Sequence, residues 1–215
     1  MGVPTSFIGF PSAAFDFYDD LEADNSKTFW EANKQVYADA VRAPMVALID
    51  RLAAEFGTAK IFRPYRDVRF AADRTPYKTH QGAFVEAAPA TGWYVEMAAS
   101  GFRVAVGFYH ASTAGLAAVR TAIDGPLGAE LETIVTRMRR GGWQLGGEQL
   151  KTAPRGFGAD HSRIELLRHK SMTLSRSYGF DAVVHTPALV TRVRRDWRAG
   201  RSFVEWMVAR LDGTS

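Results

Sequence analysis

The chain has 215 residues, of which 47% are hydrophobic and 23% are charged, and its formal net charge is +4. These values fit a folded protein with one sizeable core and exclude a disordered chain. Cysteine is absent, which excludes disulfides and thiolate chemistry and leaves only histidine and carboxylates as zinc ligands.

The first residues, MGVPTSFIGFPSAAF, lack the charged start and the continuous apolar run of a signal peptide. No apolar run approaches the roughly 20 residues that a membrane helix needs. We therefore expect a soluble, cytoplasmic protein without a membrane partner.

Two helices are predicted first. Ser12 can cap the segment AAFDFYDDLEA, in which apolar residues recur at helical spacing. Asn25-Ser26 ends that helix and caps a second one, which extends from Lys27 to about residue 56. Pro44 lies inside the second helix and should kink or split it.

Short strands are predicted next. Residues 60–66 form a weak strand, because Pro64 favours an edge position or a bulge. Stronger strands follow at residues 82–86, 93–98 and 102–108, the last with apolar residues at every second position. This pattern predicts an antiparallel meander that is packed by the N-terminal helices.

After Thr113 the pattern returns to helix, and the last two predicted helices cover residues 188–199 and 202–211. We find no internal repeat and no linker. The predicted fold class is therefore α+β: an antiparallel β-meander sheet packed against N-terminal and C-terminal helices. We expect a single globular domain over residues 1–215.

Charge is concentrated in one segment. Residues 60–80 contain six Lys or Arg and two Asp, and four aromatic residues are placed among them. Residues 1–59, in contrast, carry four cations and nine anions. The basic, aromatic segment predicts a site that receives an anion. A structural lattice of ion pairs between these arginines and aspartates is the alternative.

Within this segment the residues Asp73 to Pro76 predict a turn that directs the following side chains back towards the preceding strand. Guanidinium and ammonium groups can hold a phosphate or carboxylate by charge-assisted hydrogen bonds. His80 is the candidate for proton transfer, since its unperturbed pKa is near 6.5. The predicted catalytic residues are His80 and Asp67, and the predicted ligand-binding residues here are Arg66, Arg69, Arg74, Tyr77 and Lys78.

A second basic cluster covers residues 150–172, where several cations surround a loop rich in Gly and Pro. Lys151 and His161 are the candidate ligand-binding residues in it, and Asp160 can cap a following helix. The glycine spacing matches neither the dinucleotide fingerprint nor the P-loop.

The five histidines are scattered, without the local pairs that hold zinc. We therefore predict no metal site. No serine nucleophile elbow is present either, and the sequence indicates no particular cofactor.

Four segments together resemble the domain-of-unknown-function 2461 (DUF2461) family: FWEANKQVY, FRPYRDVRFAADRTPYKTHQGA, GWYVEMAASGFRVAVGFY and LKTAPRGFGADHSRIELLRHKS. The resemblance covers about residues 10–211. It implies a soluble, mainly bacterial single domain without an established activity, substrate or cofactor. Thr152 departs from the family pattern, in which a basic residue commonly follows the lysine. The motif positions in this chain are Arg66, Asp67, Arg69, Phe70, Asp73, Thr75, Pro76, Tyr77, Lys78 and His80, then Leu150, Lys151, Pro154, Gly156, Asp160, His161 and Lys170.

The leading functional hypothesis is a basic, aromatic-lined cleft that binds a phosphorylated or carboxylated small molecule; whether it also catalyses a reaction is left open. A nucleic-acid-associated binding protein is the alternative, because arginine and aromatic residues together suit phosphate contacts and base stacking. A third hypothesis is a non-catalytic interaction protein whose Arg/Asp cluster is structural. Neither the ligand nor the oligomeric state follows from the sequence.

Overall fold

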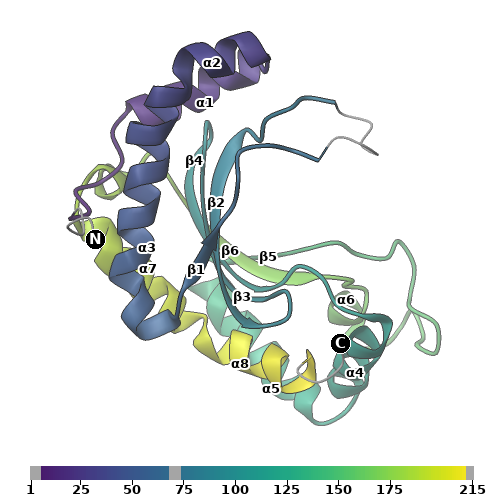
Figure 1. The fold of residues 1–215 in the computed structure, drawn as a ribbon. Coiled ribbons are helices and arrows are strands. Elements are labelled where there is room, and N and C mark those ends of the chain that lie inside the picture. The colour runs from purple at the N-terminus through teal and green to yellow at the C-terminus, as the bar shows by residue number, and fades with distance from the viewer. Residues whose placement is uncertain (1–5, 68–73, 212–215) are drawn as a thin grey trace. The chain divides into compact units, whose positions relative to one another are not determined.

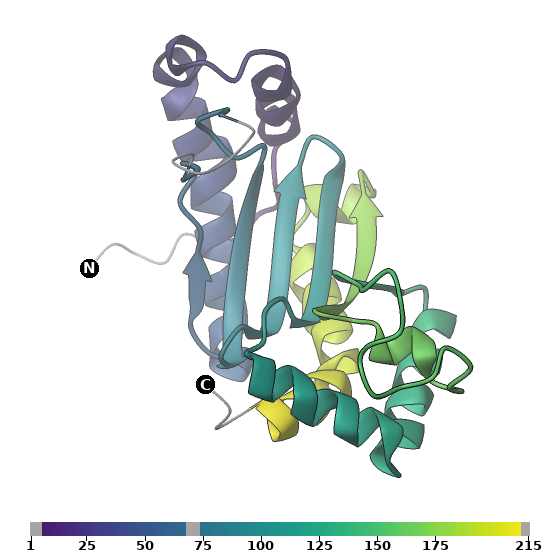
Figure 2. The same cartoon turned by 90° about the vertical axis from the view of Figure 1, so that its right-hand side faces the viewer.

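Six strands form one antiparallel sheet in the order β1-β2-β3-β4-β6-β5. The structure is a computed structural model, and it describes residues 6–67 and 74–211. Figure 2 shows the strands side by side. The predicted α+β class with an antiparallel sheet is confirmed. The strands are β1 (Ala59–Ile61), β2 (His80–Ala88), β3 (Thr91–Ala98), β4 (Gly101–Phe108), β5 (Gln144–Gly146) and β6 (Met172–Gly179).

Two compact units can be distinguished in the chain. The first unit contains residues 1–85, 94–104 and 177–195, and the second contains residues 86–93, 105–176 and 196–215. We describe each unit by itself. The expectation of one domain over residues 1–215 stays a prediction.

The helices of the first unit begin with α1 (Ala13–Ala23) and α2 (Lys27–Val36). At α2 the predicted cap is present, since Ser26 Oγ accepts a hydrogen bond from the Phe29 amide at 3.1 Å. At α1 the predicted side-chain cap is absent. Ser12 already has helical backbone angles there, and its carbonyl oxygen, rather than its hydroxyl, accepts from the first amides of the helix.

Pro44 splits the long second helix as predicted, through a wider turn (Figure 1). A π-helix, η1 (Tyr37–Arg42), separates α2 from α3 (Ala43–Phe56). The Ala43 amide donates to the Ala38 carbonyl, five residues earlier. Pro44 then falls in the first turn of α3, directly after the π-helix.

In the first unit, the two faces of β3 and β4 differ in burial. Val95 and Met97 on β3 are fully buried, as is Phe102 on β4, whose ring lies 5.6 Å from that of Phe10. Tyr94 and Glu96 alternate with the buried residues and therefore project from the other face. We call this second face the open face. Helix α3 packs beside β1.

The second unit is built from helices that pack on one another, α4 (Thr113–Asp124), α5 (Leu127–Arg140) and α8 (Arg201–Leu211). The Trp206 indole on α8 donates to the Leu127 carbonyl at 3.3 Å. Helix α7 (Ala188–Ala199) ends in this unit, where the Trp197 carbonyl accepts from the Trp93 indole at 3.3 Å. A 3-10 helix, η2 (Ala182–His185), precedes α7 in the first unit.

Two elements differ from the sequence-based expectation. Strand β6 was not predicted, although Met172, Leu174 and Tyr178 recur at even spacing and are buried. Arg176 interrupts that apolar series. The helix expected after Asp160 is reduced to the single turn α6 (Ile164–Leu167), and Asp160 does not cap it.

No helix in the described part of the chain combines the length and the apolar character that a membrane crossing requires.

Gly107 on β4 is a position where the fold leaves little room for a side chain. Its φ is +128°, and a Cβ there would lie 2.2 Å from the Met172 carbonyl oxygen. We expect Gly107→Ala to lower the free energy of unfolding by about 3 kcal/mol, because strain and a backbone clash add. Urea unfolding measures this loss.

Gly156 is the matched control, since its φ is also positive, at +92°, but a Cβ there would meet no atom within 4 Å. Gly156→Ala should lose only the energy of the conformational strain, about 1 to 2 kcal/mol. Equal losses at the two glycines would show that the close approach of β4 and β6 is not what requires Gly107.

Candidate functional site

The basic segment between β1 and β2 folds as an extension of these two strands. The Phe62 amide donates to the Gly82 carbonyl at 3.0 Å, and the Lys78 amide donates to the Pro64 carbonyl at 2.7 Å. The Arg66 amide donates to the Pro76 carbonyl at 2.9 Å. We call residues 62–67 and 74–79 the arm. Its backbone pairing sets which of its side chains share a face.

Aromatic rings and one amide hold the arm on the N-terminal helices. The Tyr77 ring stacks on Trp30 of α2, with centroids 4.4 Å apart and planes at 9°. The Asn25 side chain donates to the Tyr77 carbonyl at 3.1 Å and accepts from the Tyr77 amide at 3.0 Å. Asn25 thus pairs with Tyr77 as a neighbouring strand would. Tyr77, a predicted ligand-binding residue, is 4% exposed and supports the arm.

The other predicted residues of the arm have different surroundings. A guanidinium nitrogen of Arg66, Nη1, donates to Thr75 Oγ1 at 2.6 Å. Asp67 and Arg74 are exposed. Arg69 lies outside the described residues. The roles assigned to these four residues stay predictions.

Glu96 on the open face of β3 is the centre of the polar contacts next to the arm. Arg103 on β4 donates to both of its carboxylate oxygens, from Nε at 2.7 Å and from Nη2 at 2.9 Å. The Tyr94 hydroxyl donates to Oε2 at 2.6 Å. His80, the first residue of β2, places Nε2 at 3.9 Å from the same oxygen. Four side chains from three strands therefore meet.

Glu96 is ionised in this arrangement. Burial on its own would raise the pKa of the carboxyl, whose side chain is 12% exposed. The hydrogen bonds from Arg103 and Tyr94, together with the Arg103 charge, outweigh burial and lower the pKa. Burial and the Glu96 charge in turn raise the pKa of the Tyr94 phenol, which remains a hydrogen-bond donor.

Gly82 on β2 makes room for Tyr94. A Cβ at this glycine would lie 2.4 Å from the Tyr94 hydroxyl oxygen. The Tyr94 ring can therefore lie across β2, where it reaches Phe62 with ring centroids 6.3 Å apart. Tyr94 and Phe62 form an aromatic surface beside the Glu96 carboxylate.

Two lysines lie over the Phe62 ring, with Lys60 Nζ at 5.9 Å and Lys78 Nζ at 5.3 Å from the centroid. Within residues 6–67 and 74–211 the structure gives no ion pair to Lys60, Lys78 or the neighbouring Arg63. Burial lowers the pKa of Lys78, and the charges of Arg63 and Lys60 lower it further. These cations repel one another without a described anion between them.

His80 experiences the same positive surroundings. Burial lowers its pKa, the Glu96 charge opposes that change, and the charges of Lys78, Arg103 and Arg66 lower the pKa further. The imidazole is therefore neutral at neutral pH. We call the set that faces this region the open-face site, comprising Lys60, Phe62, Lys78, His80, Tyr94, Glu96 and Arg103.

Gln81 holds the floor of the site from the opposite face of β2. It is 1% exposed, and its amide nitrogen donates to the Phe62 and Gly82 carbonyls, each at 2.9 Å. The Tyr37 hydroxyl on the π-helix donates to its oxygen at 2.6 Å. Burial raises the pKa of Tyr37, and the nearby Arg42 opposes that rise.

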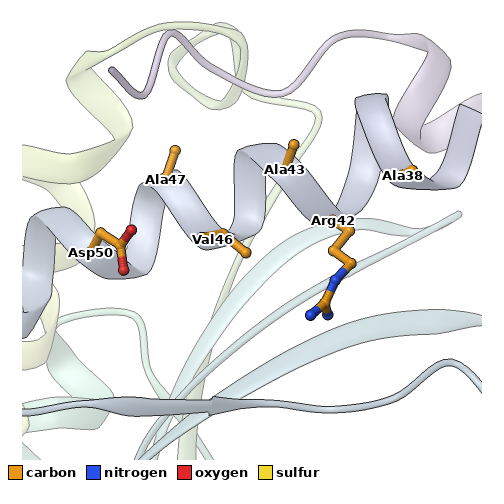
Figure 3. Close-up of a pocket in the computed structure, with 6 residues that line it drawn as sticks. All are labelled: Ala38, Arg42, Ala43, Val46, Ala47 and Asp50. Atoms are coloured by element: carbon orange, nitrogen blue, oxygen red, sulfur yellow. The ribbon is translucent and has the colours of Figure 1, made fainter. Parts of the chain in front are cut away.

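A hollow of about 320 Å³ runs along the π-helix and α3 (Figure 3). Arg42 and Asp50 are its charged lining residues, and the described remainder is alanine and valine. Because all the lining residues described come from one helix, no second element supplies converging polar groups there. We do not assign a ligand to it.

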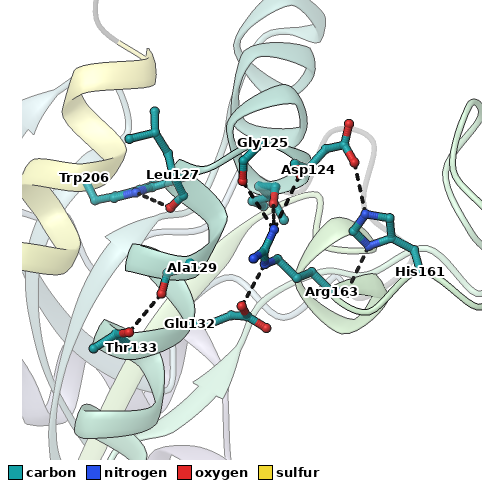
Figure 4. Close-up of polar contacts among 10 residues, drawn as sticks. Asp124, Gly125, Leu127, Ala129, Glu132, Thr133, His161, Arg163 and Trp206 are labelled. Atoms are coloured by element: carbon teal, nitrogen blue, oxygen red, sulfur yellow. Dashed lines mark hydrogen bonds and ion pairs between the residues drawn. The ribbon is translucent and has the colours of Figure 1, made fainter.

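The two predicted residues of the later basic cluster, Lys151 and His161, belong to the second unit. Figure 4 shows the polar contacts of His161. His161 accepts the Arg163 amide on Nδ1 at 2.9 Å, so the hydrogen is on Nε2, which lies 3.0 Å from Asp124 Oδ1. Arg163 itself donates to the carbonyls that end α4, at Ile123 and Gly125, and to Glu132 at 2.7 Å. His161 thus helps to attach its loop to α4.

Lys151 is exposed, and its carbonyl accepts a hydrogen bond from the Arg168 guanidinium. Ligand binding by Lys151 and His161 stays a prediction. In the part of the chain that the structure describes, no group of three His, Asp or Glu side chains is placed to hold a metal ion.

Of the seven residues of the open-face site, Lys78 and His80 were predicted as site residues. Lys60 and Phe62 were noted only as members of the basic segment, and Tyr94, Glu96 and Arg103 on the strands were missed. A signal for them was present, because each is a polar residue at an alternate position of an otherwise apolar strand. That pattern identifies the open face of a strand. Only strand pairing brings Glu96 opposite Arg103 and both of them beside His80.

Glu96→Gln tests the ionised carboxylate. Because folding lowers the Glu96 pKa, the carboxylate stabilises the fold above its unfolded pKa, and this contribution is lost as pH falls through the lower, folded pKa. We expect the variant to lose about 1 to 2 kcal/mol of unfolding free energy at pH 7. The difference in unfolding free energy between wild type and Glu96→Gln should become smaller below about pH 4, which is near the ordinary pKa of Glu.

Urea unfolding between pH 3 and pH 7 measures this, with Glu22→Gln as control because Glu22 is an exposed carboxylate on α1. A difference between wild type and Glu96→Gln that stays constant with pH would contradict the role of the charge.

The comparisons with known proteins agree with the expected family. The model of a family described as a conserved hypothetical protein (DUF2461) matches residues 13–206. A search of curated proteins gave no match. The family match includes every residue of the open-face site, and the chain belongs to the DUF2461 family.

Proposed function

We propose that this protein binds a small anion, phosphorylated or carboxylated, at the open-face site. The supporting observation is the pair of lysines over the Phe62 ring, Lys60 and Lys78, which have no ion pair in the described residues. Burial and the charges of Arg63 and Lys60 lower the pKa of Lys78. Cations that lie close together without counter-charges repel one another, which raises the free energy of the folded protein. An anion bound among them removes part of this repulsion.

The neighbouring residues suit the two parts of such a ligand. The ammonium groups of Lys60 and Lys78 can donate to its acidic oxygens. Arg103 is held in one orientation by Glu96 while its side chain stays 46% exposed, so its remaining Nη1 can also donate. Phe62 and Tyr94 offer an aromatic surface to the organic part of the ligand.

The proposal concerns binding. His80 is the group in the site that can accept a proton near neutral pH, because its imidazole is neutral there. Catalytic roles for His80 and for Asp67, which is exposed on the arm, stay predictions from the sequence.

Isothermal titration calorimetry with phenyl phosphate and with benzoate tests the proposal. We expect at least one of the two to bind wild type and Lys78→Met to weaken it about ten- to a hundredfold, since a charge-assisted hydrogen bond contributes about 1.5 to 3 kcal/mol. Lys27→Met is the control, because Lys27 is an exposed lysine at the start of α2, in the same unit but outside the open-face site. It should bind as wild type does.

Other outcomes favour the other hypotheses. If neither probe binds, but single-stranded oligonucleotides bind with an affinity that falls steeply with salt, the nucleic-acid alternative replaces this proposal. If nothing binds and Lys78→Met only lowers stability, the cluster is structural.

A further inference from the structure

The ligand's charge and the protonation of His80 can be inferred next, on the assumption that the proposed function holds. We propose that the open-face site selects a dianion, such as a phosphate ester, over a monoanion, and that His80 takes up one proton from solvent when the dianion binds.

The charge count around Phe62 supports a dianion. Arg103 is neutralised by the two-oxygen contact with Glu96. Lys60 and Lys78, which lie over the ring, have no ion pair among residues 6–67 and 74–211. A monocarboxylate would offset only one of these two charges. A phosphate ester, which carries about two negative charges near neutral pH, offsets both.

His80 lies beside the Glu96 carboxylate, and the Lys78 charge also acts on it. Its side chain is 38% exposed, and its Nε2 is 3.9 Å from Glu96 Oε2. The charged groups that act on it are Glu96 on β3, Arg103 on β4, and Lys78 and Arg66 on the arm. Three of the four are cations, and the carboxylate already accepts hydrogen bonds from Arg103 and Tyr94. In the free protein this balance and burial together favour the neutral imidazole.

A bound dianion reverses that balance. It offsets the Lys78 charge that opposes protonation of His80, and it adds negative charge to the site. An opposite charge within about 6 Å favours the protonated imidazole. The imidazolium would then have two anions near it, Glu96 and the ligand. By linkage, affinity for the dianion rises as pH falls towards the His80 pKa of the complex.

Sulfate and acetate are the probes for this inference, since sulfate stays a dianion and acetate a monoanion between pH 6 and pH 8. Calorimetry at pH 6, 7 and 8, in two buffers of different ionisation enthalpy, measures affinity and proton uptake together. We expect sulfate to bind at least about tenfold more tightly than acetate. Lowering the pH should increase the affinity for sulfate by up to about tenfold per pH unit, and proton uptake should approach one proton per bound sulfate.

His80→Gln should lose both the pH dependence of sulfate binding and the proton uptake. His110→Gln is the matched control, because His110 is an exposed histidine of the second unit. It should keep the wild-type pH dependence. In wild type, the NMR titration of the His80 ring should give a higher pKa with saturating sulfate than without it, a result that needs no variant to fold.

Each contrary result contradicts a different part of the inference. Sulfate binding without proton uptake, or proton uptake that persists in His80→Gln, contradicts the role of His80 but not the proposed anion site. Acetate binding as tightly as sulfate overturns the selection of a dianion. If neither phenyl phosphate nor benzoate nor either ion binds at any of these pH values, the proposed function and this inference both fail.

Discussion

A carboxylate that is largely withdrawn from water must be met by hydrogen-bond donors, and Glu96 on β3 is met by two on its own face of the sheet. Arg103 occupies both carboxylate oxygens, and Tyr94 donates to one of them. This contact keeps the guanidinium and the phenol in single orientations. At the neighbouring His80, burial lowers the pKa, the Glu96 charge opposes that change, and the charges of Lys78, Arg103 and Arg66 lower the pKa further.

The site is held from both faces of β2. On the open face, Gly82 leaves room for the Tyr94 ring, because any Cβ there would contact the hydroxyl. On the opposite face, the buried Gln81 joins the Tyr37 hydroxyl of the π-helix to the Phe62 and Gly82 carbonyls. The π-helix, which directly precedes α3 and its Pro44, thus carries the residue that supports the floor of the site. Such wider turns often occur near functional sites.

Much of the fold was predictable from local patterns. The sequence pattern predicted the strands at 82–86, 93–98 and 102–108, the last from apolar residues at every second position, and the structure extends the three by up to a few residues as β2, β3 and β4. The proline in the second helix predicted a break, though not that the break is a π-helix, because this depends on how the preceding turns pack. Strand β6 was missed because Arg176 interrupts its apolar series. Arg176 Nη1 lies 3.6 Å from a carboxylate oxygen of the buried Asp196. This ion pair offsets the arginine charge on that face of the strand, and it forms only in the folded chain.

Residue types, their spacing and their formal charges were enough to indicate the family, the α+β class and the position of a basic segment that contains Lys78 and His80. They could not show which of those charges are neutralised, because that depends on the folded chain. Glu96 and Arg103 are seven residues apart along the chain, and only the β3–β4 pairing joins them and places them beside His80. Tyr77 was predicted as a ligand-binding residue because aromatic rings suit such sites, but its ring is buried against Trp30. The physical reason is that the net charge of a site is a property of pairs in contact, and contacts across strands are set by register.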